Sequence, residues 1–277
     1  IPRCILIFEY LWAGHCIPQV RQLTTHYASG FTIAACCWIA SVFVQPPFRL
    51  LFWTIGLTID FATPLTGRHH QARFLPHTEH LPERFGLFTL IVLGEAVVAV
   101  VKGVSEVDWN WMNGMCAVFG FTIAFSLWWI YFDNVDGSTL RTIKTTGGTG
   151  IFQVWLYVHL PLMIGLVGTG VGVERLILND DWTAVSSPDR WLICGSVALC
   201  LVALAILHRT GIIFKCKTRT KHRLAGAGVL FLLAIVRMPL LPSLLIGLIA
   251  AICVIQVGLD LYQGRPSQVE PDISMAA

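Results

Sequence analysis

The chain has 277 residues, of which 55% are hydrophobic and only 13% are charged, and its mean hydropathy is +0.70. Soluble domains typically contain roughly 45–50% apolar and about 25% charged residues, so this composition excludes an ordinary soluble globular protein. The formal net charge is only +3, and the basic residues lack interleaved aromatic side chains, which argues against a nucleic-acid partner. We expect an integral membrane protein whose partners are membrane lipids and a small solute or ion.

Apolar blocks near the length that crosses a hydrocarbon core of about 30 Å follow one another along the chain. They cover residues 3–14, 28–45, 48–64, 82–102, 111–132, 151–172, 191–208, 224–238 and 240–262. The pattern predicts an all-α fold, a polytopic transmembrane bundle of roughly eight or nine helices. We expect a single domain over residues 1–262 and a polar C-terminal tail over 263–277.

Three of these blocks carry local signals. The first begins at Ile1 without an initiator Met or a basic n-region, which is typical of the remainder of a longer helix, so we expect the chain to be a fragment. Pro161 predicts a kink in block 151–172. In the apolar run of residues 224–262, Pro239 and Pro242 favour a hairpin of two short arms over one long helix.

The short loops predict an orientation. Loop 209–223 holds six Lys and Arg residues and no acid, whereas the loop around Asp180 and Asp181 is acidic, so 209–223 is expected on the cytoplasmic side. Alternation then places the loops at Arg21, 68–73 and 141–144 inside as well, with Ile1 outside and the C-terminal tail inside.

A carboxylate near the middle of block 82–102 is the main functional signal. Glu95 lies roughly 18 Å along the predicted helix from its entry, close to the centre of a bilayer core. Arg84 lies three turns earlier, within about 20° of Glu95 around the helix axis, so both side chains face the same way. A carboxylate at this depth is protonated, paired with a cation or exposed to a water-filled cavity. Three roles are open for Glu95: an interhelical hydrogen bond, part of a transport or proton site, or a catalytic group.

A histidine-rich stretch precedes this helix, with His69, His70, His77 and His80. The spacing of His77, His80 and Glu83 would gather three potential metal ligands on a helix, but Pro76 and Pro82 oppose a helix there. We therefore predict a polar loop at headgroup level, no metal and no cofactor.

Other polar or small residues inside the blocks have local explanations as well. His159 would bond the carbonyl that Pro161 frees, or join Glu95 in a proton relay. We expect Trp128, Trp129 and Tyr131 to form an interfacial belt, Glu174 and Arg175 to form a rim cluster, and the glycines at 165, 168, 170 and 172 to give close packing or flexibility. Further candidate partners for Glu95 are Asp60, Asp133, Asp136 and Arg237.

Two motifs carry a family resemblance. The first is His80-x-x-Glu83-Arg84-Phe85-Gly86-Leu87-Phe88 followed by Ile91-Val92-Leu93-Gly94-Glu95, and the second is Trp128-Trp129-x-Tyr131-Phe132-Asp133. Together with the His159 to Glu174 segment, they resemble the bacterial low temperature requirement protein A family over residues 1–262. The resemblance implies a multi-pass protein of the bacterial inner membrane without an assigned biochemical activity. Members usually begin with a segment of the Glu-Leu-Phe-Phe-Asp-Leu-Val-Phe type, which has no counterpart here.

Our main functional prediction is movement of a small solute, ion or proton through the helix bundle. Glu95 would be the central ionisable group, Arg84, Glu83 and His80 its cytoplasmic gate or counter-charge, and His159 and Asp60 further site residues. One alternative is an intramembrane enzyme acting on a lipid or lipid-linked substrate, with His80, Glu83 and His159 as acid and base. The other is a non-catalytic membrane protein for stress or cold adaptation.

Overall fold

The structure is a computed structural model that describes residues 2–67, 80–133, 149–179, 184–210, 217–236 and 238–264. Within these ranges the chain forms nine α-helices and two short 3-10 helices and contains no strand, so the predicted all-α fold is confirmed. Each α-helix coincides with one of the predicted apolar blocks. The α-helices are α1 (Pro2–Cys16), α2 (Arg21–Ala40), α3 (Phe48–Thr66), α5 (His80–Ser105), α6 (Trp111–Phe132), α8 (Thr149–Ile177), α9 (Ser187–Thr210), α10 (Lys217–Ile235) and α11 (Pro242–Gly264).

Six helical segments among the described residues are long and apolar enough to cross a membrane. They correspond to α2, α5, α6, α8, α9 and α11. Many large apolar side chains point outward on these helices, including Ile91, Val118 and Ile164, each more than half exposed. Outward apolar side chains are what a protein needs when its solvent is lipid rather than water.

Helix boundaries follow from local chemistry. Asn110 caps α6, because its side-chain oxygen accepts a 2.8 Å hydrogen bond from the Asn113 backbone N–H. Pro242 is the first residue of α11, where its missing N–H costs nothing. The predicted hairpin is confirmed, because α10 ends at Ile235 and α11 begins at Pro242. Pro161 lies inside α8, which continues on both sides of it.

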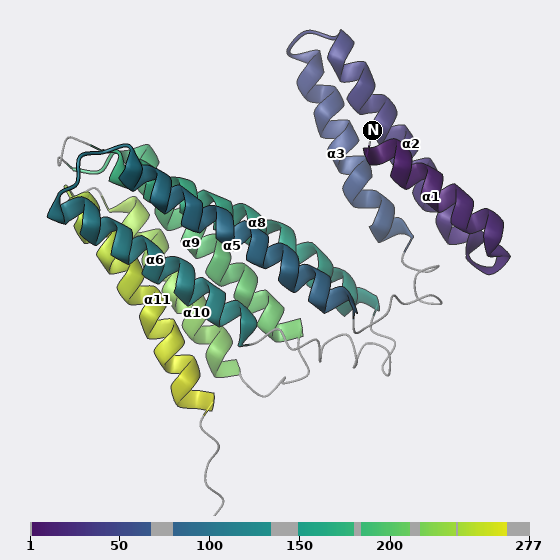
Figure 1. Ribbon diagram of the computed structural model, residues 1–277. Coiled ribbons are helices and arrows are strands. Elements are labelled where there is room, and N and C mark those ends of the chain that lie inside the picture. Colours follow the sequence, from purple (N-terminus) through teal and green to yellow (C-terminus); the bar gives the residue numbers. More distant parts are fainter. Residues whose placement is uncertain are drawn as a thin grey trace, which may run out of the picture. The chain divides into compact units, whose positions relative to one another are not determined.

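The chain divides into two compact units, which we describe separately. The first comprises residues 1–77 and 143–153, and the second comprises residues 78–142 and 154–277. In the first unit α2 packs against both α1 and α3 (Figure 1). Tyr10 of α1 stacks on Tyr27 of α2 at 5.2 Å between ring centroids. The expected single domain over residues 1–262 stays a prediction.

The second unit is a bundle of α5, α6, α8, α9, α10 and α11 (Figure 1). In this unit α6 packs against α5 and α11, and α9 packs against α10. Buried apolar side chains from several helices, such as Ile123, Leu166 and Leu201, form its core. This unit positions the charged site described below.

Glycines bring α8 into backbone contact with two neighbours. A Cβ atom added at Gly165 would lie 2.6 Å from Cys200 Sγ of α9, and one added at Gly170 would lie 2.8 Å from the Cα atom of Ala96 of α5. Only glycine permits such an approach of one helix to another. The predicted close packing along this glycine run is therefore confirmed.

Candidate functional site

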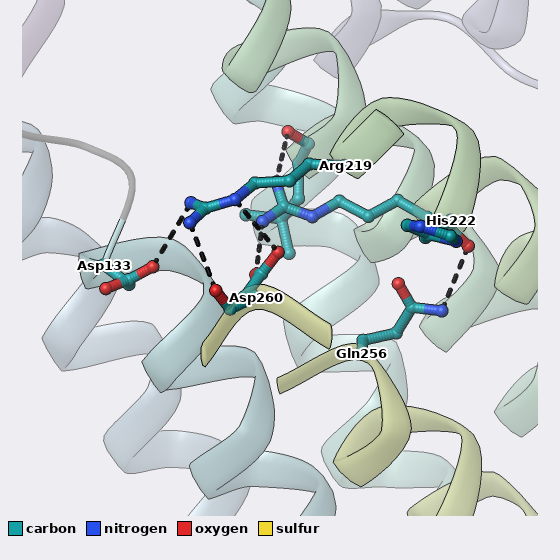
Figure 2. A network of polar contacts seen from close by, with 7 residues as sticks. Asp133, Arg219, His222, Gln256 and Asp260 are labelled. Atoms are coloured by element: carbon teal, nitrogen blue, oxygen red, sulfur yellow. Dashed lines mark hydrogen bonds and ion pairs between the residues drawn. The ribbon is translucent and has the colours of Figure 1, made fainter. Parts of the chain in front are cut away.

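Four charged side chains from three helices meet at one end of the second unit (Figure 2). Asp133 directly follows α6, Arg219 and Arg223 lie one turn apart near the start of α10, and Asp260 lies near the end of α11. We call these four residues the charged cluster. Because residues four apart share a helix face, the sequence of α10 directs both arginines towards α11.

The innermost contact is an ion pair between Arg223 and Asp260. Arg223 Nη2 lies 2.8 Å from Asp260 Oδ2, and Arg223 Nη1 donates a 3.2 Å hydrogen bond to the carbonyl of Leu204 in α9. The two charged side chains are 1% and 5% exposed. A lone charge so deeply buried would be very costly, so each of these groups depends on the other.

Arg219 connects this pair to the surface (Figure 2). Its Nε atom lies 3.6 Å from Asp260 Oδ1, its Nη1 atom lies 3.5 Å from Asp133 Oδ2, and its Nη2 atom donates to the backbone carbonyl of Asp260 at 3.2 Å. The Arg219 side chain is 15% exposed and that of Asp133 is 38% exposed. Exposure therefore falls stepwise from Asp133 through Arg219 to the buried pair.

Two further polar groups adjoin the charged cluster. Gln256, one turn before Asp260, donates a 3.0 Å hydrogen bond to the carbonyl of His222 and ties α11 to α10 (Figure 2). His208 of α9 lies within electrostatic reach of Arg223, Arg219 and Asp260. Its Nε2 atom is buried and has no hydrogen-bond partner in the described part of the chain. The cluster thus sets the buried Asp260 carboxylate close to the His208 imidazole, and these two groups can hold or relay a proton.

Sequence reasoning missed most of this cluster. Asp133 was a candidate partner, but Arg219 and Arg223 counted only as signals of membrane orientation, and Asp260 was not singled out. A signal was present, because Asp260 is an acid within an apolar block and the adjacent helix begins with arginines spaced by one turn. The pairing itself required knowledge of which helices are neighbours.

The structure places Glu95, Arg84, Glu83 and His80 on the exposed surface of α5 in the second unit. His80 Nδ1 lies 3.7 Å from Glu83 Oε2, with both side chains largely exposed. A Cβ atom added at Gly94, next to Glu95, would meet no atom within 4 Å. The structure therefore brings His80 and Glu83 together, while Glu95 lies on an open side of the helix.

His159 is buried in an aromatic environment within the second unit. Its Nδ1 atom donates to the carbonyl of Trp155 at 2.7 Å, so in the neutral ring Nε2 accepts from the hydroxyl of Tyr131, 3.3 Å away. His159 does bond a backbone carbonyl, but that of Trp155 and not that of Tyr157, which lies four residues before Pro161. Tyr131 is 1% exposed, so its assignment to an interfacial belt is wrong. The burial of its ring against His159 and Phe132 explains the difference.

Asp60 belongs to the first unit, where it has its own partners. Both of its carboxylate oxygens accept hydrogen bonds from Arg3 of α1, at 2.8 and 2.7 Å, and Oδ2 also accepts one from Trp38 Nε1 of α2 at 3.2 Å. The Arg3 guanidinium lies 5.4 Å from the centroid of the Trp38 ring. Asp60 thus joins the three helices of this unit.

The expected rim cluster of Glu174 and Arg175 is wrong. Glu174 pairs with Lys102 of α5 at 2.8 Å, whereas Arg175 pairs with Asp189 of α9 at 2.9 Å. Adjacent residues on a helix point about 100° apart, so they reach different neighbours. No group of three His, Cys, Asp or Glu residues in the described ranges could hold a metal ion. The remaining predicted residues, His69, His70, His77, Asp136 and Arg237, lie outside the described residues.

Comparison with known proteins assigns the chain to a protein family. The family model described as bacterial low temperature requirement A protein (LtrA) matches residues 1–258. The chain belongs to this family. The two segments that carry the family resemblance, residues 80–95 and 128–133, lie in α5 and at the end of α6, and the second of them ends at Asp133. With its apolar helices, the chain is an integral, multi-pass membrane protein.

A similar curated protein is the uncharacterized protein RA0937 of Rhizobium meliloti (strain 1021), with 27% identity over 156 residues. The match covers 52% of this chain and 37% of that relative. No solved structure matches the chain.

Proposed function

We propose that this low temperature requirement A protein moves a small ion, most simply a proton, across the bacterial inner membrane. The observation that carries this proposal is the Arg223–Asp260 pair, a carboxylate and a guanidinium almost fully buried within a helix bundle. Ionisable groups at such positions are costly and typically mark ion pathways or proton relays. The sequence analysis names Glu95 as the central carboxylate, whereas this proposal rests first on Asp260 in the second unit.

The charged cluster suggests how a proton enters. Asp133 is the most exposed member and reaches Arg219, which in turn lies between Asp133 and Asp260 (Figure 2). Protonation of Asp260 would remove its attraction for Arg223 and Arg219 and free both guanidinium groups to shift towards Asp133. Release of the proton would restore the buried pair. His208 supplies an imidazole within electrostatic reach of Asp260.

Glu95 remains part of the proposal as a second ionisable group. It lies on the exposed side of α5, and Arg84, Glu83 and His80 are exposed near the start of the same helix. A carboxylate facing hydrocarbon would be expensive, so we propose that Glu95 faces water or another polar group along the transport pathway. Arg84, Glu83 and His80 would form the charged entrance.

Flux measurements in proteoliposomes test this proposal. A proton or cation gradient is imposed, and flux is compared for the wild type, Asp260→Asn and Glu95→Gln. We expect Asp260→Asn to abolish flux and Glu95→Gln to reduce it, while Glu106→Gln, at an exposed position outside the charged cluster, leaves it unchanged. Folding is checked by retention of helical circular dichroism. Wild-type flux no greater than that of empty liposomes, or full flux in a folded Asp260→Asn variant, would contradict the proposal and favour a purely structural cluster.

A further inference from the structure

A cavity of about 600 Å³ opens in the second unit between the start of α9 and the end of α10. Arg190 and Ser187 contribute its polar wall, and Trp191, Ile235 and Met238 contribute much of its apolar wall. None of these residues belongs to the charged cluster, which lies at the opposite ends of α9 and α10. The orientation predicted from the loops places this cavity at the outer membrane surface.

Arg190 is buried, with only 6% of its surface exposed. It donates to the carbonyl oxygens of Val236, Met238 and Val185, the last two at 2.6 and 3.4 Å. No carboxylate of the described ranges lies within ion-pair distance of it. The adjacent acid, Asp189, is instead bound by Arg175 and Ser186.

Among the described residues, the partners of this buried positive charge are backbone carbonyl groups alone. The Nε atom of Arg190 is buried and has no hydrogen-bond partner in the described structure. Removing a guanidinium from water without a counter-charge is costly, and an anion in the adjoining cavity would lower that cost. The start of α9 contributes the positive end of its helix dipole at the same place, which also favours an anion.

The apolar side chains that line the rest of the cavity favour an anion that carries an apolar chain. Ile235 and Met238 are more than half exposed, and the indole of Trp191 packs edge-to-face on Phe231 of α10, with 5.4 Å between centroids. Phe231, half exposed, extends the apolar surface along α10 away from Arg190. A free inorganic anion would gain nothing from this surface, whereas an acyl chain would.

We propose that this cavity binds the phosphate headgroup of an anionic phospholipid, with Arg190 as its counter-charge and an acyl chain along Trp191, Phe231 and Ile235. The site needs no transport activity and is therefore independent of the function proposed above. Its occupant would fill the space between α9 and the connection from α10 to α11. Bound lipid would thus stabilise that connection against the bundle.

Substitution of Met238 tests the site without removing Arg190. The backbone carbonyl of Met238 accepts from Arg190, while its side chain lines the cavity, so a side-chain change keeps the hydrogen bond. Met238→Glu adds a negative charge beside Arg190, and Met238→Gln is the neutral control of the same length. Ile235→Glu and Ile235→Gln form a second pair at an exposed position of the same wall.

Binding is measured by native mass spectrometry of the detergent-purified chain titrated with phosphatidylglycerol, phosphatidylcholine or inorganic phosphate. We expect the wild type and both Gln variants to prefer phosphatidylglycerol over phosphatidylcholine. At least one Glu variant that remains folded should lose about tenfold in affinity for phosphatidylglycerol, or roughly 1.4 kcal/mol. Equal affinity for the two lipids, or unchanged binding in the folded Glu variants, would overturn the proposal. Displacement of phosphatidylglycerol by equimolar phosphate would overturn the lipid assignment in favour of a free-anion site.

Discussion

Arg223 of α10 and Asp260 of α11 form a 2.8 Å ion pair that is almost completely removed from solvent. The same Asp260 carboxylate faces Arg219, whose contacts with Asp260 and Asp133 are longer, at 3.6 and 3.5 Å. The cluster therefore has one tight internal pair and one looser connection to the surface. This difference in burial predicts that substitution of Asp260 lowers the free energy of unfolding more than substitution of Asp133.

Asp260→Asn should destabilise the second unit strongly, by about 3–5 kcal/mol, because it leaves the Arg223 guanidinium buried without a counter-charge. Asp133→Asn, at the exposed end of the cluster, should cost at most about 1 kcal/mol. Chemical or thermal unfolding in detergent micelles measures both values. The double substitution Arg223→Met with Asp260→Leu should recover most of the lost stability, because it removes both charges together. Equal effects of the two Asn variants would contradict the burial gradient.

Gly165 and Gly170 of α8 should tolerate no side chain. Gly165→Ala and Gly170→Ala would each force apart two helices, and we expect each to cost about 1–3 kcal/mol. Gly195→Ala on α9 is the matched control, because a Cβ atom there meets nothing within 4 Å, and alanine should be neutral or stabilising. Thermal unfolding of the three variants in the same detergent checks this ordering. Destabilisation by Gly195→Ala as large as that by Gly170→Ala would refute the contact explanation.

Removing the hydroxyl of Tyr131 should have a small but measurable effect. Tyr131→Phe leaves the ring packing intact and deletes the 3.3 Å hydrogen bond to His159 Nε2, so we expect a loss of about 0.5–1.5 kcal/mol. Tyr262→Phe, at a largely exposed position near the end of α11, should change the unfolding free energy by less than about 0.5 kcal/mol. Unfolding curves of the two variants give the comparison. A Tyr131→Phe variant as stable as wild type would mean that this hydrogen bond contributes nothing.

The stability of the first unit should depend on the Asp60 carboxylate. Asp60→Asn removes the charge that receives two hydrogen bonds from Arg3 and one from Trp38, which should cost about 1.5–3 kcal/mol. Glu9→Gln, an exposed position on α1, is the control and should be neutral. Because the effect is local, protease accessibility of α1 to α3 is the appropriate measurement. Equal proteolysis of the two variants would exclude Asp60 as the group that joins the three helices.

The helices were predictable from the sequence, whereas most side-chain pairings were not. Apolar block length and the prolines at 239 and 242 locate the helices, because these signals act within about 20 residues. Arg223 and Asp260 pair because α10 packs against α11, and Tyr131 is buried because α6 packs near α8. Such pairings depend on helix packing, which local periodicity does not encode. Glu95 is a further example, because its position along the helix was predictable but the side of the bundle that it faces was not.

The contact of α8 with α5 and α9 has a consequence for temperature. Glycine has no rotamers to lose, and inside a bilayer helices are held by van der Waals contact and hydrogen bonds, without a hydrophobic driving force between them. The hydrophobic effect that holds a water-soluble core weakens on cooling, whereas a glycine-mediated helix contact does not rely on it. The packing at Gly165 and Gly170 should therefore keep these three helices together in the cold as firmly as in the warm.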